Sequence, residues 1–254
     1  MILAHELVGR HDAPQVVLVH GITESHSSWH PLIAPLAQHH SVLAVDLRGH
    51  GDSDFDDPYE IASYAGDVVE TCAAFRFTDA LLVGHSLGGA VVTAAAAMGP
   101  CAAVVNVDQP LRLAAFKDAL MSIEPALRGS PDGFEATMHA MFDSMAGPLD
   151  EREAARIAGI RRPDQAVVLG TWRAVFESSV DELDATVGSM LGAVTVPYLS
   201  LHGDDPGDEY RAWLTSQCAT ATVEVWPEHG HYPHLVDQPR FLERLAAFEA
   251  EVRG

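Results

Sequence analysis

Short runs of β-branched and other apolar residues alternate with longer segments of helical period along most of the chain. Each apolar run ends at a Gly, Asp or Pro, which is typical of a mainly parallel sheet connected by crossover helices. The pattern therefore predicts an α/β fold. The expected strands are Val16–Val19, Val42–Val45, Ala80–Val83, Ala103–Val107, Tyr198–Leu201 and Thr222–Val225, with an antiparallel edge at Leu3–Val8. The expected helices are Trp29–Ala37, Tyr59–Phe75, Leu87–Met98, Glu209–Cys218 and Pro239–Val252.

The regular alternation stops after Asp108. From Leu111 to about Val194 there are only amphipathic helical segments, interrupted by prolines and glycines. We therefore expect residues 1–110 and 195–254 to form the core and residues 111–194 to form a helical cap insert over one end of the sheet. Several methionines lie at helical spacing in this insert, and they suit either plain core or the wall of an adaptable apolar pocket.

Composition and charge limit the classes of molecule that the protein is expected to bind. A chain of 254 residues with 48% hydrophobic residues can bury one sizeable core. Because 36 acidic residues outweigh 15 basic ones, the formal charge is −21, and such a surface repels phosphate backbones and anionic lipid. We expect a small-molecule substrate and neither nucleic acid nor membrane as a partner. The oligomeric state is open.

The cysteines and the N-terminal residues indicate in which cellular compartment the protein is expected. Cys72, Cys101 and Cys218 are an odd number without CxxC spacing, so they indicate neither a disulfide framework nor a zinc knuckle. The first residues have no basic start followed by an apolar run, as a secretion signal would. These features favour a cytoplasmic protein.

The strongest chemical signal is residues 81–90, LLVGHSLGGA, where an apolar strand runs into Gly-x-Ser-x-Gly and then into an Ala-rich helix. This is the context of a nucleophile elbow, in which a serine occupies a strained turn beside a helix N-terminus. Small residues at Gly84 and Gly88 would let strand and helix approach each other. A glycine-rich turn without function is the alternative, since the motif also occurs by chance.

Four motifs in order resemble the α/β-hydrolase superfamily over most of the chain. His20-Gly21 resembles the oxyanion loop, Asp46–Ser53 the turn after the next strand, Gly84–Gly89 the elbow, and Gly230–Leu235 the loop that carries the catalytic histidine. The resemblance implies a mostly parallel, doubly wound sheet, the α/β-hydrolase fold, with a helical cap.

Carried over to this sequence, the resemblance implies that Ser86 is the nucleophile and His231 its general base. A hydroxyl is a weak nucleophile, so an imidazole must take its proton during attack and later return it to the leaving group. The backbone amides of Ile22 and Leu87 would bind the oxyanion. His85, beside the serine, is expected to be mostly structural.

The acid that orients the histidine is less well defined. Asp205 follows the penultimate strand, where the family usually keeps this carboxylate, although the spacing from Gly203 is one residue shorter than usual. Asp108 ends the strand after the nucleophile, a position that some relatives use instead. We favour Asp205 and keep Asp108 as the alternative. Either residue could also be a helix cap or a turn former.

Three histidines close in sequence, His229, His231 and His234, raise the possibility of a metal site. No HExxH motif or matching Cys or Asp set accompanies them, and the glycine before His231 fits the hydrolase loop. We therefore expect neither a metal nor another cofactor.

A serine in the elbow disfavours haloalkane dehalogenase and epoxide hydrolase chemistry, because those relatives place an aspartate there. Acyl transfer to water through an acyl-enzyme is the natural reaction of such a serine. The sequence therefore indicates a serine hydrolase acting on an ester or lactone of a small, largely apolar substrate. The alternatives are a carbon–carbon bond hydrolase of the same fold and a ligand-binding member without catalysis.

Overall fold

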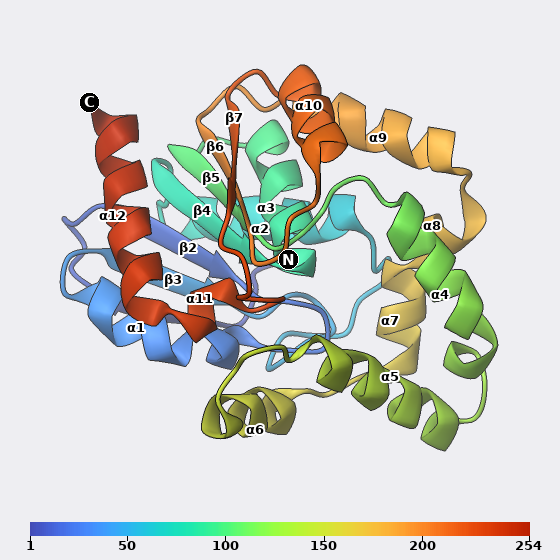
Figure 1. Cartoon of the computed structure of the whole chain (residues 1–254). Helices are drawn as coiled ribbons and strands as arrows, with labels where there is room; N and C mark the ends of the chain where they lie inside the picture. Colours follow the sequence, from blue (N-terminus) through green and yellow to red (C-terminus); the bar gives the residue numbers. More distant parts are fainter.

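Seven strands form one sheet at the centre of the computed structural model, which describes residues 1–254 (Figure 1). The spatial order is β1-β3-β2-β4-β5-β6-β7, and all neighbours are parallel except β1 and β3. The sequence thus predicts the α/β class and the antiparallel edge correctly. The strands are β1 (His5–Gly9), β2 (Gln15–Val19), β3 (Ser41–Val45), β4 (Ala80–His85), β5 (Ala103–Val107), β6 (Tyr198–His202) and β7 (Ala221–Val225).

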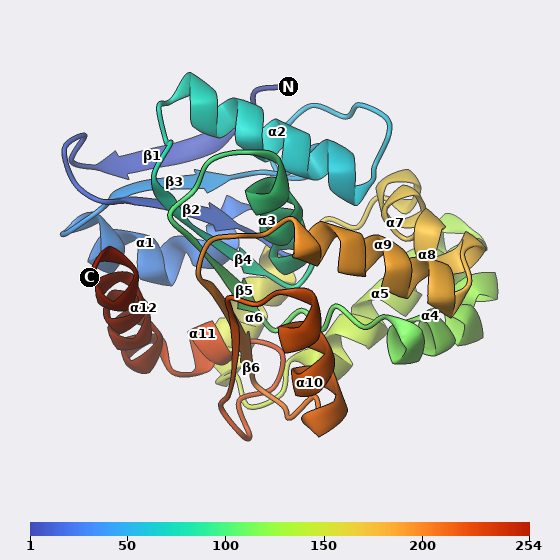
Figure 2. The ribbon, with the colours of Figure 1, turned by 90° about the horizontal axis from the view of Figure 1, so that it is seen from above.

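Helices cover both faces of the sheet, so the central strands are buried on both sides and consist of continuous apolar runs. Helices α2 and α3 lie on one face of the sheet, and α1 and α12 lie on the other (Figure 2). Alternate residues of β2 contribute to the two cores: Val17 and Val19 belong to the core with α2 and α3, and Val16 and Leu18 to the core with α1 and α12. The helices of these layers are η1 (His26–Trp29), α1 (His30–Ala37), α2 (Ile61–Ala74), α3 (Leu87–Met98), α10 (Asp208–Gln217), α11 (Pro233–Val236) and α12 (Gln238–Arg253).

The segment expected as a helical insert contains six helices and no strand, and it lies beyond the carboxyl ends of the parallel strands (Figure 2). Four of the six begin at a side chain that accepts a hydrogen bond from the first turn: Ser130, Asp150, Asp164 and Ser179. The helices are α4 (Ala114–Leu127), α5 (Pro131–Met145), α6 (Glu151–Ile160), α7 (Gln165–Thr171), α8 (Arg173–Glu177) and α9 (Val180–Gly192).

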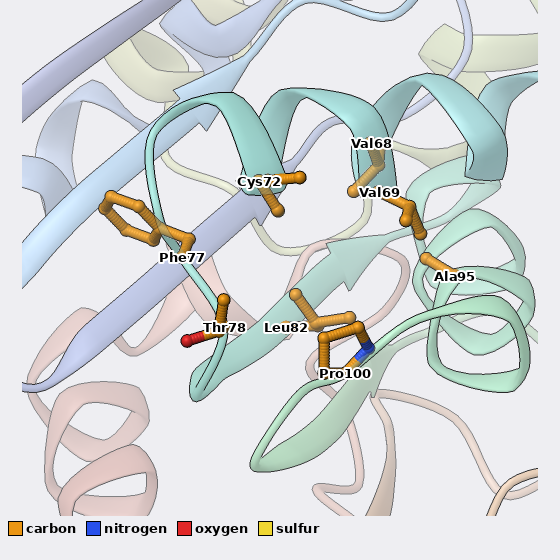
Figure 3. A pocket seen from close by; sticks show the side chains of 9 residues that line it. Val68, Val69, Cys72, Phe77, Thr78, Leu82, Ala95 and Pro100 are labelled. Atoms are coloured by element: carbon orange, nitrogen blue, oxygen red, sulfur yellow. The ribbon is translucent and has the colours of Figure 1, made fainter.

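A small apolar cavity of about 50 Å³ lies between α2, α3 and β4 (Figure 3). Phe77 and Pro100 line it from the loops that precede β4 and β5, so it is near the amino ends of these strands. Ser86 follows the carboxyl end of β4, so the cavity is remote from the candidate chemistry. No helix is both long and apolar enough to cross a membrane.

Candidate active site

Ser86 lies at the turn between β4 and α3 and has φ 51° and ψ −125°. A non-glycine residue at positive φ is strained, and such strain is found at functional turns. Two glycines permit this turn, because a Cβ on Gly84 would overlap the carbonyl of Gly88, and one on Gly88 would overlap the carbonyl of Val19. The local geometry is therefore that of the expected elbow.

His231 follows β7, and its Nδ1 lies 2.7 Å from Oδ2 of Asp108, which follows β5. The other oxygen of Asp108 accepts the backbone N–H of Gly203 at 2.9 Å. Burial by itself would raise the pKa of Asp108, but the hydrogen bond from His231 and that from Gly203 outweigh it and hold this pKa below its usual value. The carboxylate thus stays ionised, and it accepts the hydrogen bond that the N–H at Nδ1 of His231 donates.

The other ring nitrogen of His231, Nε2, is buried and has no hydrogen-bond partner in the protein. With the Nδ1 proton held by Asp108, Nε2 of a neutral imidazole carries a free lone pair. The ring can therefore accept a proton from a hydroxyl and later return it.

The prediction that Asp205 orients His231 is wrong, because Asp108 occupies that position. Its side chain is 62% exposed, and its Oδ1 accepts hydrogen bonds from Arg211 Nη1 and from the backbone N–H of Gly207, each at 2.8 Å. The carboxylate thus closes the turn before α10 instead of reaching His231. The shortened spacing after Gly203 was the signal that this loop differs from the usual one.

The loop after β2 lies against the elbow, since a Cβ placed on Gly21 would be 3.3 Å from the Cβ of Ser86. His20 braces this loop: its Nε2 accepts the N–H of Leu47 at 3.0 Å, so its Nδ1 donates to the carbonyl of Gly21 at 2.7 Å. The amide of Ile22 makes none of the hydrogen bonds found in the loops. Leu87 begins α3, where an amide has no acceptor within the helix.

Helix α6 and the residues after it dock on the same loop. The guanidinium of Arg156 donates to the carbonyls of Ser27 and Ser28 at 2.7 and 2.9 Å. The backbone N–H of Arg162 donates to the carbonyl of Thr23 at 2.8 Å. The helical segment is therefore tied to the loop that carries Ile22.

Sequence reasoning missed a cluster of buried polar side chains, Glu24, Arg161 and Tyr232, next to His85 of the elbow. Glu24 is 3% exposed and Arg161 5%, and both lie near Tyr232, whose hydroxyl bonds to Glu24 and accepts from Arg161. His85, expected to be structural, bonds through Nε2 to the carbonyl of His231 at 2.8 Å. Nothing near Glu24 in the sequence signals these contacts, because they come from distant segments.

The side chains that the structure brings within reach of one ion are Glu6, His26 and His30, whose ligand atoms lie within 4.8 Å of one another. The buried carboxylate of Asp46 binds Nδ1 of His26 at 2.9 Å and raises the pKa of His26, so a proton competes with a metal for the ring. Of the expected histidine cluster, His229 bonds to the carbonyl of Pro227 and His234 is fully buried against Trp29.

The fold and these motifs together define an α/β hydrolase. A sequence profile of the alpha/beta hydrolase family matches residues 16–245, so the chain belongs to this family. It is 27% identical over 259 residues to "Esterase YbfF" of Escherichia coli, covering 97% of each chain. It is also 39% identical over 79 residues to "Uncharacterized protein Rv2715" of Mycobacterium tuberculosis, a match that spans 31% of this chain and 23% of that protein.

Solved structures share the fold. The E-2-(acetamidomethylene)succinate hydrolase superposes with a TM-score of 0.78 at 24% identity, over 98% of this chain and 95% of that one. The enol-lactonase from Burkholderia xenovorans LB400 gives a TM-score of 0.74 at 21% identity, over 98% and 96%. At this level of identity the similarity concerns the arrangement of helices and strands.

Proposed function

We propose that this chain is a serine hydrolase that cleaves an ester or lactone of a small, largely apolar substrate through an acyl-enzyme on Ser86. One observation carries the proposal: Asp108 binds Nδ1 of His231 at 2.7 Å while Nε2 of the same ring is buried without a partner. A ring held in this way is prepared to accept the proton of a nucleophile. The strained turn at Ser86 would supply that nucleophile, since the preceding residue, His85, bonds to the carbonyl of His231 at 2.8 Å.

In the proposed reaction, Ser86 Oγ attacks the substrate carbonyl while its proton passes to Nε2 of His231. Asp108 stabilises the imidazolium that forms, and the amides of Ile22 and Leu87 bind the oxyanion of the tetrahedral intermediate. His231 then protonates the leaving alkoxide. Water attacks the acyl-enzyme by the reverse proton transfers and releases the acid.

The names of the relatives support this class of substrate, since they include an esterase that matches along its whole length and an enol-lactonase of the same fold. The placement of the helical segment beyond the carboxyl ends of the strands also fits, because open α/β sheets bind ligands there. We propose that residues 111–194 act as a cap that shapes the pocket.

The test is a panel of nitrophenyl esters of graded acyl length and of simple lactones. We expect turnover by the wild type and a loss of about 10⁶-fold in Ser86→Ala. Ser122→Ala is the matched control, because its hydroxyl bonds only within its own helix, to the carbonyl of Ala119, and it should keep full activity.

A coloured dienolate from ring cleavage belongs in the same panel. Rapid loss of the dienolate with negligible ester turnover would replace the proposal by carbon–carbon bond hydrolysis. Ester turnover that survives in Ser86→Ala would remove the serine mechanism altogether. A folded wild type that binds these ligands without converting them would indicate a binding protein.

A further inference from the structure

We propose that Glu24 is a positioning residue of this site: its carboxyl group is protonated and donates a hydrogen bond to Nδ1 of His85, which in turn holds the backbone of His231. The inference rests on the proposed function, since it concerns how the catalytic histidine is held. Glu24 itself lies behind the reacting groups and does not contact substrate.

Glu24 lies where the three catalytic segments meet. It is two residues after Ile22, His85 directly precedes Ser86, and Tyr232 directly follows His231. The hydroxyl of Tyr232 donates to Glu24 Oε1 at 2.9 Å, and Oε2 of the same carboxyl lies 3.9 Å from Nδ1 of His85. One buried side chain thus links the oxyanion loop, the elbow and the histidine loop.

The proton on His85 can be assigned from its partner. Its Nε2 lies 2.8 Å from the backbone carbonyl oxygen of His231, and a carbonyl only accepts, so Nε2 carries the hydrogen. Burial lowers the pKa of His85 to about 3, so the ring is neutral and its Nδ1 is a bare acceptor. Nδ1 of His85 and Oε2 of Glu24 face each other, and both are buried without another partner.

An ionised Glu24 would therefore place two acceptors opposite each other in the interior, and neither would be satisfied. A protonated carboxyl supplies the missing donor, and a small side-chain movement closes the 3.9 Å separation to a hydrogen bond. Gly21 leaves room for this, because a Cβ there would be 3.3 Å from His85 Nδ1 and 3.5 Å from Glu24 Oε2.

The charges around Glu24 agree with this assignment. Burial raises its pKa, and the hydrogen bond from Tyr232 and then the charges of Arg161 and His231 act against that rise without reversing it. The guanidinium of Arg161 donates to the hydroxyl of Tyr232 at 3.2 Å and to Asp143 at 3.3 Å, so its ion pair is with Asp143. Glu24 thus has no cation in direct contact.

The hydrogen bonds close a ring around the histidine loop. Tyr232 donates to Glu24, and His85 donates to the carbonyl of His231, the residue before Tyr232. The proposed bond from Glu24 to His85 would join the two. The backbone of His231 is therefore held from both sides, which supports the contact between its ring and Asp108. Loss of this ring of bonds should slow the chemistry while the overall fold persists.

Infrared spectroscopy tests the protonation without any substrate. The difference spectrum between wild type and Glu24→Gln at neutral pH should contain the C=O stretch of one protonated carboxylic acid. Its absence would overturn the assignment. This measurement does not depend on hydrolysis, so it separates failure of this inference from failure of the proposed function.

Kinetics test the positioning. The rate of labelling by a fluorophosphonate should stay near that of the wild type in Glu24→Gln, because the amide replaces both hydrogen bonds, and should fall about 10-fold or more in Glu24→Met. KM for an ester should change little in either variant, since Glu24 does not contact substrate. Equal rates in Glu24→Met and wild type, or an equally slow Glu24→Gln, would each overturn the inference.

A second pair of variants covers the case in which Glu24→Met fails to fold. Tyr232→Phe removes the donor to Glu24 and should slow labelling several-fold. Tyr64→Phe is its matched control: it loses a similar buried hydrogen bond, to Thr171 at 2.7 Å, that is no part of the bonds around Glu24. It should lower the thermal stability slightly with no change in labelling. Equal labelling rates in the two variants would contradict the positioning role.

Discussion

The exchange of Asp108 for Asn is the sharpest test of the proposed mechanism, because the surroundings determine how the new amide lies. Oδ1 of Asp108 accepts the N–H of Gly203, and only the oxygen of an asparagine can keep that bond. The NH₂ group must then face Nδ1 of His231, which now has to accept. The ring proton moves to Nε2, so the nitrogen needed as a base can no longer take a proton.

The size of the loss follows from this change of tautomer. Where the orienting aspartate of a serine enzyme is replaced by asparagine, kcat falls about 10⁴-fold with the geometry intact. That factor corresponds to about 5 kcal/mol in the activation barrier. We expect a loss of this order for Asp108→Asn in ester turnover, with KM within a few-fold of the wild type.

Asp205→Asn is the matched comparison. Its carboxylate is largely exposed and bonds to Arg211, and exposed ion pairs of this kind contribute about 0.2–1 kcal/mol. Its turnover should stay near the wild-type rate. A loss of less than about 10-fold in Asp108→Asn, or a comparable loss in Asp205→Asn, would refute the assignment of Asp108.

Two further predictions concern stability. Burial alone would raise the pKa of Asp46, but hydrogen bonds from His26 and from the backbone lower it to about 2. The stability that the ionised carboxylate contributes is therefore present above its unfolded pKa near ~4 and is lost as the pH falls toward 2. In urea unfolding, Asp46→Asn should cost about 2 kcal/mol at neutral pH and less near pH ~3. An unchanged difference at the two pH values would contradict this. Ser86→Gly should relieve the strain at φ 51° and raise the free energy of unfolding by about 1 kcal/mol while abolishing turnover; a destabilised variant would contradict the strain.

The strands could be predicted because a sheet covered on both faces requires continuous β-branched runs, such as Val16–Val19 and Ala103–Val107. The elbow could be predicted because close backbone approach leaves only glycine at Gly84 and Gly88. Both signals are local, so they can be read along the chain.

The carboxylate that binds His231 and the buried cluster around Glu24 could not be predicted with the same success. Asp108 and Asp205 each follow a strand end, and their roles differ only because one turns toward His231 and the other toward Arg211. Glu24 meets Tyr232 across 208 residues of sequence. Such contacts arise from packing between segments, and a charged loop residue gives no local sign that it will be buried.

The most direct test of the central claim is covalent labelling by a fluorophosphonate, followed by peptide mapping of the adduct. We predict one adduct per chain at Ser86 in the wild type, none in Ser86→Ala, and strongly slowed labelling in Asp108→Asn. An adduct at another residue, or a folded wild type that remains unlabelled, would contradict the account.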